Sequence, residues 1–237
     1  MNEYREIEKS FQKLNIALTE KQINQFVRYY ELLMEKNKVM NLTAITEFCD
    51  VVSKHFIDSL MICKVAEPKG KLIDIGTGAG FPGIPLKIVY PDLKIVLLDS
   101  LNKRVQFLNE VIRELGLNDI DAVHGRAEDF AKNESYREQS DICVSRAVAN
   151  LSSLAEYCIP FVKKGGFFAA YKSGNIQEEL EAAKKAIYIL GGKLENKVEV
   201  QLPDTDISRC ILQIRKIKET PKKFPRKSGM PTKEPIS

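Results

Sequence analysis

A glycine-rich stretch carries the strongest chemical signal in the sequence. Residues 74–83 read Asp-Ile-Gly-Thr-Gly-Ala-Gly-Phe-Pro-Gly and lie between a short apolar run and a helical pattern. Backbone N–H groups of such a loop can approach a ligand closely because glycine has no side chain, and the start of the following helix favours anionic groups. Residues 78–83 fit G-x-G-x-x-G, but glycine-rich turns are common, so this pattern alone predicts only some nucleotide-like cofactor.

Charged residues follow the next three apolar runs. Asp99 comes directly after the run 94–98, where the ribose of a bound cofactor would lie, with a helix cap or turn residue as the alternative. Glu128 follows the third run and suits either an adenine edge or the ordinary first turn of a helix. Arg146 ends the fourth run, where it can orient a cofactor or a target base, with a surface ion pair as the alternative. S-adenosylmethionine and NAD both contain a ribose, so these positions do not separate them.

The elements that must hold these residues alternate between short β-rich runs and helical patterns from residue 71 onward. Such alternation predicts a doubly wound, mostly parallel seven-stranded α/β sheet covered by helices on both faces. The last two runs are joined by residues 203–207 alone, which suffices for a hairpin but not for a crossover helix, so an antiparallel pair is expected. The predicted strands are 71–75, 94–98, 120–123, 141–145, 166–171, 193–202 and 208–217, and the predicted helices are 84–89, 103–115, 151–161 and 177–190.

The chain divides into three predicted parts: an N-terminal helical segment packed on the core at 1–66, a cofactor-binding domain at 67–218 and a basic tail at 219–237. Apolar residues recur at helical spacing in the first part. A second such stripe places His55 on an apolar face, where a structural histidine is the favoured interpretation and a switch or base is the alternative. The first stripe comprises Ile23, Phe26, Val27, Tyr30, Leu33 and Met34.

Composition limits the class of protein further. A hydrophobic content of 44% in 237 residues suits one α/β domain with an extra segment. The five cysteines lie in apolar segments without paired spacing, which predicts buried reduced thiols and no metal site. No apolar run approaches the roughly 20 residues of a membrane span, and the first residues do not resemble a signal peptide. A cytoplasmic protein is therefore expected.

Positive charge is concentrated at the C-terminus. The net charge is +4, whereas residues 215–237 hold eight basic residues against two acidic ones, or +6, which leaves residues 1–214 at −2. One interpretation of the last fifteen or so residues is a solvated, poorly ordered end. The favoured interpretation is contact with RNA, in which Phe224 would stack on a base. The candidate RNA-binding residues are Lys222, Lys223, Arg226 and Lys227.

The ordered motifs resemble a known family. Asp74 with the glycines after it, Asp99 and the Ala127-Glu128 pair resemble class I S-adenosylmethionine-dependent methyltransferases. A narrower resemblance, to the RsmG (GidB) family, covers nearly the whole chain. Its motifs here are Asn41-Leu42-Thr43, His55-Phe-x-Asp58-Ser59-Leu60, the run 76–85, Ser145-Arg146-Ala147 and Pro225-Arg226-Lys227-x-Gly229-x-Pro231.

Members of this family methylate N7 of a guanine in bacterial small-subunit rRNA, so the resemblance implies that reaction here, at position 527 in the customary RNA numbering. It implies S-adenosyl-L-methionine as the cofactor and 16S ribosomal RNA or the small ribosomal subunit as the partner; we expect a monomer. Guanine N7 has a lone pair and no proton, so no general base is expected, and Arg146 would orient the cofactor or the base. The implied cofactor-binding residues are Gly76, Gly78, Phe81, Asp99, Ser100, Leu101, Ala127, Glu128 and Arg146.

Two other classes of function compete with a methyltransferase. An NAD-dependent oxidoreductase would use the same glycines and Asp99, but no suggestive Tyr-x-x-x-Lys or His/Asp pair is present to donate a proton. A noncatalytic RNA-binding module would account for the basic tail and would leave the glycine loop unexplained. The resemblance, rather than the spacing, favours the methyl donor over NAD.

Overall fold

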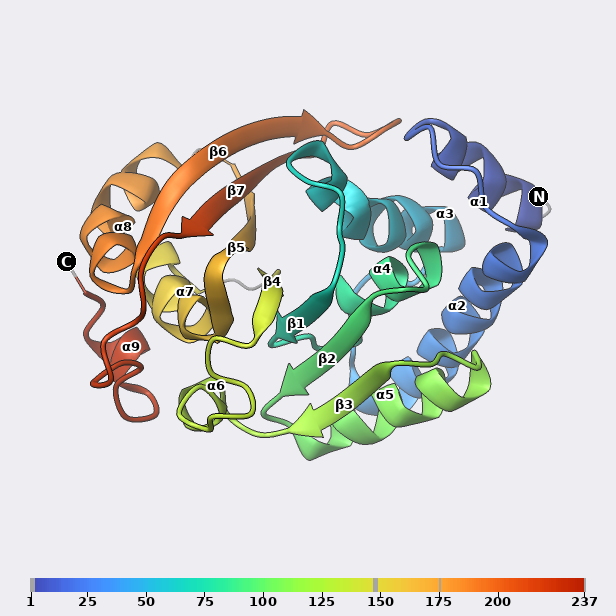
Figure 1. Cartoon of the computed structure of the whole chain (residues 1–237). Coiled ribbons are helices and arrows are strands. Elements are labelled where there is room, and N and C mark those ends of the chain that lie inside the picture. The colour runs from blue at the N-terminus through green and yellow to red at the C-terminus, as the bar shows by residue number, and fades with distance from the viewer. Residues whose placement is uncertain (1–2, 147–148, 175, 237) are drawn as a thin grey trace.

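The computed structural model describes residues 3–146, 149–174 and 176–236, which fold around a central seven-stranded sheet (Figure 1). The strands are β1 (Lys71–Ile75), β2 (Lys94–Asp99), β3 (Ile120–His124), β4 (Ser140–Ser145), β5 (Val162–Ser173), β6 (Gly192–Gln201) and β7 (Ser208–Lys216). Their spatial order is β3-β2-β1-β4-β5-β7-β6. The first five strands run parallel, while β7 lies antiparallel between β5 and β6. The predicted seven-stranded sheet with a terminal hairpin is therefore confirmed.

Helices cover both faces of this sheet (Figure 1). They are α1 (Glu3–Gln12), α2 (Glu20–Met40), α3 (Phe48–Val51), the π-helical turn η1 (Val52–Ile57), the 3₁₀ turn η2 (Leu60–Lys64), α4 (Gly83–Val89), α5 (Asn102–Glu114), α6 (Ala127–Phe130), α7 (Leu151–Cys158), the 3₁₀ turn η3 (Ile159–Phe161), α8 (Gln177–Ile189) and α9 (Met230–Lys233). Successive side chains of a strand point to opposite faces. On β1, Leu72 packs in a core with α1, α2, α4 and α5, whereas Ile73 packs in a second core with α7 and α8.

The N-terminal helices share the first core with the sheet. Helix α2 begins at a capping box, in which the side chains of Thr19 and Gln22 each accept a hydrogen bond from the other's backbone N–H. It ends where Asn41 adopts the left-handed conformation, with φ of 48°. The buried face of α2 follows much of the predicted stripe and also includes Tyr29, which the stripe omitted.

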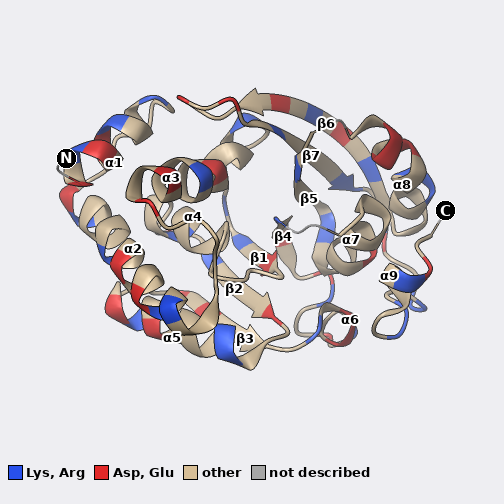
Figure 2. Cartoon of the chain, turned by 180° about the vertical axis from the view of Figure 1, so that it is seen from behind, with Lys and Arg blue, Asp and Glu red and all other residues tan. Residues whose placement is uncertain are grey.

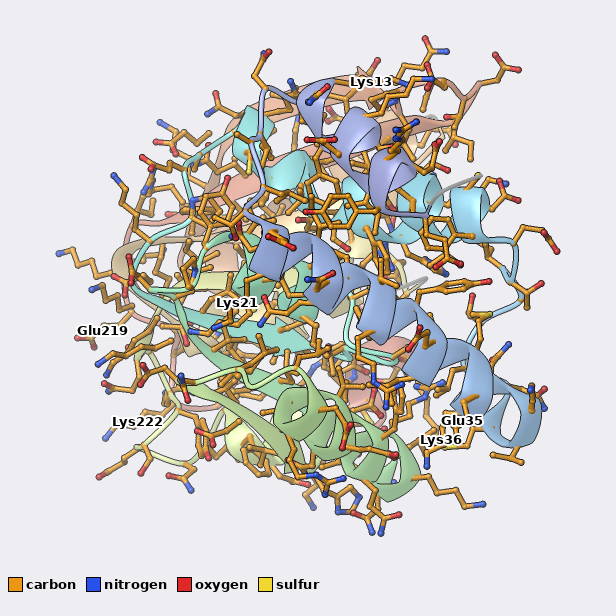
Figure 3. All side chains as sticks on the ribbon, turned by 90° about the vertical axis from the view of Figure 1, so that its right-hand side faces the viewer. Lys13, Lys21, Glu35, Lys36, Glu219 and Lys222 are labelled. Carbon is orange, nitrogen blue, oxygen red and sulfur yellow. The ribbon has the colours of Figure 1, made fainter. Side chains whose placement is uncertain are left out.

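Charged residues of both signs lie on the outer helices α2, α5 and α8 (Figure 2). Near the end of α2, Lys36 forms an ion pair of 2.9 Å with Glu110 of α5 (Figure 3). Exposed pairs of this kind contribute at most about 1 kcal/mol each, so the apolar cores hold the helices on the sheet.

The C-terminal segment packs on α7, contrary to the interpretation of a poorly ordered end. The Ser153 hydroxyl donates a hydrogen bond of 2.7 Å to the carbonyl oxygen of Pro231, and the hydroxyls of Tyr157 and Thr232 lie 2.7 Å apart. Phe224 is only 7% exposed and belongs to the second core. The expectation that Phe224 stacks on a base is therefore wrong, because burial of its ring in the core removes the face that a base would need.

All five cysteines are free thiols. Cys143, Cys158 and Cys210 are buried as predicted, but Cys49 is exposed on α3 and Cys63 is half-buried. Within the described residues, no helix is both long enough and apolar enough to cross a membrane.

Candidate functional site

A cavity of about 420 Å³ opens at the carboxyl ends of β1, β2 and β3. Its volume falls within the range of roughly 300–1,000 Å³ that is typical of small-molecule sites. The parallel strands meet at this edge of the sheet, where α/β folds bind their ligands. The cavity is lined by Ile75, Gly76, Leu98, Ser100, Leu101, Gly125, Arg126, Ala127, Glu128, Tyr157, Ser228 and Gly229. Five of the predicted cofactor residues, those at 76, 100, 101, 127 and 128, are thus brought together.

The glycine loop forms one wall of this cavity. Gly76 has φ of +70°, which disfavours other residues, and a Cβ atom at this position would meet no protein atom within 4 Å. Behind the loop, the Tyr29 hydroxyl donates a hydrogen bond of 2.5 Å to the carbonyl oxygen of Ala79. A Cβ at Gly80 would lie 2.7 Å from that hydroxyl oxygen, so the loop and α2 fit only with glycine there. Nothing in the sequence indicated a role for Tyr29 beyond its position beside the stripe of α2.

Asp74 anchors the loop from below. Its Oδ2 accepts hydrogen bonds from the Thr77 hydroxyl (2.7 Å) and from the backbone N–H of Gly83 (2.9 Å), which ties the end of β1 to the start of α4. Its Oδ1 is buried and has no hydrogen-bond partner among the described residues. Burial raises the pKa of Asp74 to about 7, because desolvation penalises the charged carboxylate more than the two donors favour it.

Asp99 lies beneath the rim of the cavity rather than among the residues that line it. Its Oδ2 accepts the backbone N–H of Gly78 and its Oδ1 accepts that of Leu101, each at 2.9 Å, and its exposed fraction is 3%. The structure therefore brings Asp99 and Gly78 together in the turn-residue arrangement, the alternative interpretation of this aspartate. A contact between Asp99 and a ribose stays a prediction.

The C-terminal segment closes the cavity on the side of α6. The carboxylate of Glu128 is only 6% exposed and accepts a hydrogen bond of 2.9 Å from the backbone N–H of Gly229. Close by, Arg126 donates to the Ser228 hydroxyl. Sequence reasoning did not foresee that residues of the tail line the candidate cofactor site, because no local pattern links positions 128 and 229.

A second cavity, of about 450 Å³, lies beyond the end of β4. Its lining residues are Ile45, Lys54, His55, Asp58, Arg146, Tyr171, Lys172, Ser173, Glu179 and Arg209. The two remaining predicted cofactor residues meet beside it, since the Arg146 guanidinium carbon is 5.0 Å from the centre of the Phe81 ring. The Phe81 ring also stacks on His55 at 4.5 Å. Phe81 comes from the glycine loop and thus connects the two cavities. Ala147, the third residue of the Ser145-Arg146-Ala147 motif, lies outside the described residues.

A buried carboxylate organises this second cavity. Asp58 is 1% exposed, and its two oxygens accept from Nη1 of Arg146 (2.9 Å) and from Nε of Arg209 (3.0 Å). Asp58 was noted only as part of a family motif, and nothing in the sequence singled out Arg209. The surface ion pair considered for Arg146 is in fact a partly buried one, with a buried carboxylate as the partner.

His55 is fixed as a neutral ring. Nη2 of Arg146 lies 3.3 Å from Nδ1 of His55, so Nδ1 must accept, and Nε2, 2.8 Å from the Thr43 hydroxyl oxygen, carries the proton. Burial, together with the charge of Arg146, lowers the pKa of His55 to about 3. A histidine that stays neutral at physiological pH supports the structural interpretation over a switch.

The four candidate RNA-binding residues separate into two kinds. Lys222, Lys223 and Lys227 are exposed, and Figure 3 shows Lys222 at the edge of the molecule. Arg226 instead donates to the fully buried carboxylate of Glu156, from Nε at 3.0 Å and from Nη2 at 2.6 Å. The guanidinium of Arg226 thus holds the tail to α7.

Solved structures share this architecture. The TYW2 protein of P. horikoshii, in complex with MeSAdo, is similar with a TM-score of 0.54 and 18% identity over 68% of this chain and 62% of that chain. TrmN from Thermus thermophilus is similar with a TM-score of 0.51 and 15% identity over 70% and 53% of the two chains. These likenesses concern the fold alone. The strand order and the helices on both faces are those of the class I methyltransferase fold.

The family described as rRNA small subunit methyltransferase G, or GidB, matches residues 22–229. The ribosomal RNA small subunit methyltransferase G of Lachnoclostridium phytofermentans is 57% identical over 225 residues, 94% of this chain and 93% of that protein. The protein of the same name in Alkaliphilus oremlandii is 55% identical over 95% of both chains. The chain belongs to this family, as the motifs predicted. Membership decides for the methyl donor over NAD and against a noncatalytic module.

Proposed function

We propose that the protein transfers the methyl group of S-adenosyl-L-methionine to N7 of guanine 527 in 16S ribosomal RNA. The observation that carries the proposal is the cavity at the ends of β1, β2 and β3, which is lined by five of the nine predicted cofactor residues in a chain of this family. Its relatives are named for ribosomal RNA of the small subunit.

The residues of this cavity fit S-adenosyl-L-methionine. The open space above Gly76 admits a ligand against backbone N–H groups, and the half-exposed side chain of Leu101 offers an apolar surface to an adenine. Glu128 supplies a carboxylate on the same wall. Beneath the loop, the unpartnered oxygen of Asp74 is an acceptor that suits a cationic ligand. When bound, the cofactor supplies a methyl group activated by an attached sulfonium.

The chain has to position the target base rather than move a proton. Guanine N7 carries a free lone pair, so attack on the methyl carbon requires no general base. Alignment of the reacting atoms alone can supply on the order of 7–11 kcal/mol. Arg146 is suited to a positioning role, since Asp58, His55 and the ring of Phe81 fix its guanidinium where the glycine loop meets the second cavity.

Ribosomal RNA, free or in the small subunit, is the proposed partner in the cytoplasm, and we expect the enzyme to act as a monomer. Lys222, Lys223 and Lys227 are the proposed phosphate contacts of the tail. Exposed lysines that form no ion pair with the described residues can follow an RNA backbone at little cost in rearrangement.

The test is methyl transfer from labelled S-adenosyl-L-methionine to purified 16S rRNA, small subunits, transfer RNA and DNA, followed by mapping of the modified base. We expect label at N7 of guanine 527 in one or both of the ribosomal substrates. Label on transfer RNA alone, or on another atom of the base, would refute the proposal. Thermal shifts with S-adenosyl-L-methionine and NAD test the cofactor separately, since only a bound ligand stabilises the native state.

A further inference from the structure

We propose that Arg209 binds a phosphate group of the target RNA strand in the second cavity, where Asp58 holds its guanidinium in place. The inference rests on the proposed function, because it assigns this cavity to the RNA substrate. It concerns a residue of β7 that lies far in sequence from the glycine loop and from the basic tail.

Arg209 has hydrogen-bond donors that the described residues leave free. Its Nε donates to Asp58 at 3.0 Å, while neither terminal nitrogen has a hydrogen-bond partner within the described part of the chain. The other cations of the cavity already have partners. Arg146 donates to Asp58 and to backbone carbonyls, and Lys172 contacts both Glu179 (2.7 Å) and the carbonyl oxygen of Ala149 (3.0 Å).

The surroundings of Arg209 favour an anion. Four cationic side chains and two carboxylates line the cavity, and His55 is neutral. Lys54 pairs with Asp50 outside the lining at 2.8 Å, so the cavity keeps an excess of one positive charge. Asp58 is shared between two guanidinium groups, so it neutralises only one of them. The uncommitted edge of a guanidinium carries paired N–H donors, a geometry that matches phosphate oxygens.

A phosphate fits the proposed reaction better than the base itself. An arginine that recognises guanine usually donates to O6 and N7. Such a contact would occupy the lone pair of N7 that has to attack the methyl carbon. Binding of the backbone leaves this lone pair free and still fixes the position of the nucleotide.

Arg209 also lies where the strand would have to pass. It pairs with Ser173 at the end of β5, and Ser173 and Arg146 line the same cavity. The cavity therefore lies at the carboxyl ends of β4 and β5, beside the strands whose ends form the candidate cofactor site. A nucleotide held there by its phosphate would have its base near the Phe81 boundary between the two cavities.

The test compares Arg209→Ala and Arg209→Lys with a matched control, Arg215→Ala. Arg215 lies on the same strand, but it pairs with Glu195 away from the cavity. Binding of 16S rRNA is measured over a salt series, and cofactor affinity is measured by calorimetry. For Arg209→Ala we expect affinity for RNA to fall about tenfold or more and the log-log salt slope to shrink by roughly 0.7–0.9. Cofactor affinity should not change.

Arg209→Lys distinguishes the contribution of the positive charge from that of the paired guanidinium donors. It keeps the charge and loses the paired donors, so the salt slope should stay near that of the wild type while affinity falls. Both variants should fold, because Asp58 keeps its hydrogen bond to Arg146. If Arg209→Ala does not fold, the same measurements on Arg209→Lys test the proposal. RNA affinity and slope that match Arg215→Ala would overturn the proposal. Loss of cofactor affinity would overturn it too, since the cavity would then hold the carboxylate of the cofactor. Failure of the proposed function is distinguishable, because the wild type itself would then leave rRNA unmethylated.

Discussion

The ion pair between Arg226 and Glu156 makes a quantitative prediction about the C-terminal segment. Arg226→Ala leaves a carboxylate with no exposed surface and no cationic partner. We expect the variant to be less stable and to bind S-adenosyl-L-methionine more weakly, because residues 228 and 229, immediately after Arg226, line the candidate cofactor cavity.

The structure sets the size of the effect. Removal of one partner of a buried pair costs about 3–5 kcal/mol. Glu156 would keep the backbone N–H of residue 226, which donates to it at 2.7 Å, so we expect about 3 kcal/mol, the lower end of that range. If the whole loss lowers the free energy of global unfolding, the melting temperature of a chain of this size falls by about 6–12 °C. When the loss falls on release of the segment alone, it weakens cofactor binding by up to about 100-fold.

Differential scanning calorimetry and titration calorimetry measure these two quantities on the same protein. The control is Lys227→Ala, since Lys227 is an exposed neighbour with no ion-pair partner among the described residues, and neither quantity should change. Glu156→Gln combined with Arg226→Ala should recover most of the loss, because no buried charge remains. A melting temperature and a cofactor affinity that both match the wild type in Arg226→Ala would refute the reasoning.

Three further predictions follow from the site. Gly76→Ala should lower the free energy of unfolding by about 1–2 kcal/mol, because φ at this position is +70°, and it should weaken cofactor binding. Normal cofactor binding by calorimetry would mean that the loop is misassigned. The raised pKa of Asp74, about 7 against an ordinary 3.8, favours the folded protein below pH 3.8, and this contribution is lost as pH rises to about 7. In urea unfolding, the free energy of unfolding of Asp74→Asn should therefore rise relative to that of the wild type between pH 3.8 and about 7. A difference in free energy that does not change with pH would contradict the burial argument. Replacing Lys222, Lys223 and Lys227 together by Ala should reduce the salt slope of rRNA binding by roughly 2–3 and leave cofactor affinity unchanged, and an equal slope would leave the tail no part in phosphate contact.

The sheet could be predicted because its signals are local. Strands β1, β2 and β4 are short, largely apolar runs that end at a polar residue or before a glycine, and the five residues between the last two runs exclude a crossover helix. The loop 74–83 is likewise a continuous stretch, so its place at the end of β1 followed from the order of the elements.

The contacts that complete the two cavities could not be predicted because they join distant positions. Asp58 meets Arg209 across 151 positions, and Glu128 meets Gly229 across 101. No periodicity spans such distances, and only the folded topology brings β7 and the tail to this edge. The family motifs included Asp58 and Gly229 without indicating what either residue contacts.

The basic residues near the C-terminus likewise have partners that composition could not indicate. The eight basic residues of 215–237 concentrate positive charge at the C-terminal end of the sequence. Three of them are paired with glutamates of the rest of the chain: Arg215 at 2.5 Å, Lys216 at 2.8 Å and Arg226 at 2.6 Å. Arg215 and Lys216 lie on β7 inside the sheet domain, whereas the pair of Arg226 holds the tail on α7. None of the three can also neutralise a phosphate without breaking its pair. In the proposed complex, the phosphate contacts would come from the exposed lysines of the tail, together with Arg209 in the second cavity. A substrate that engages both would be held on either side of the candidate cofactor site.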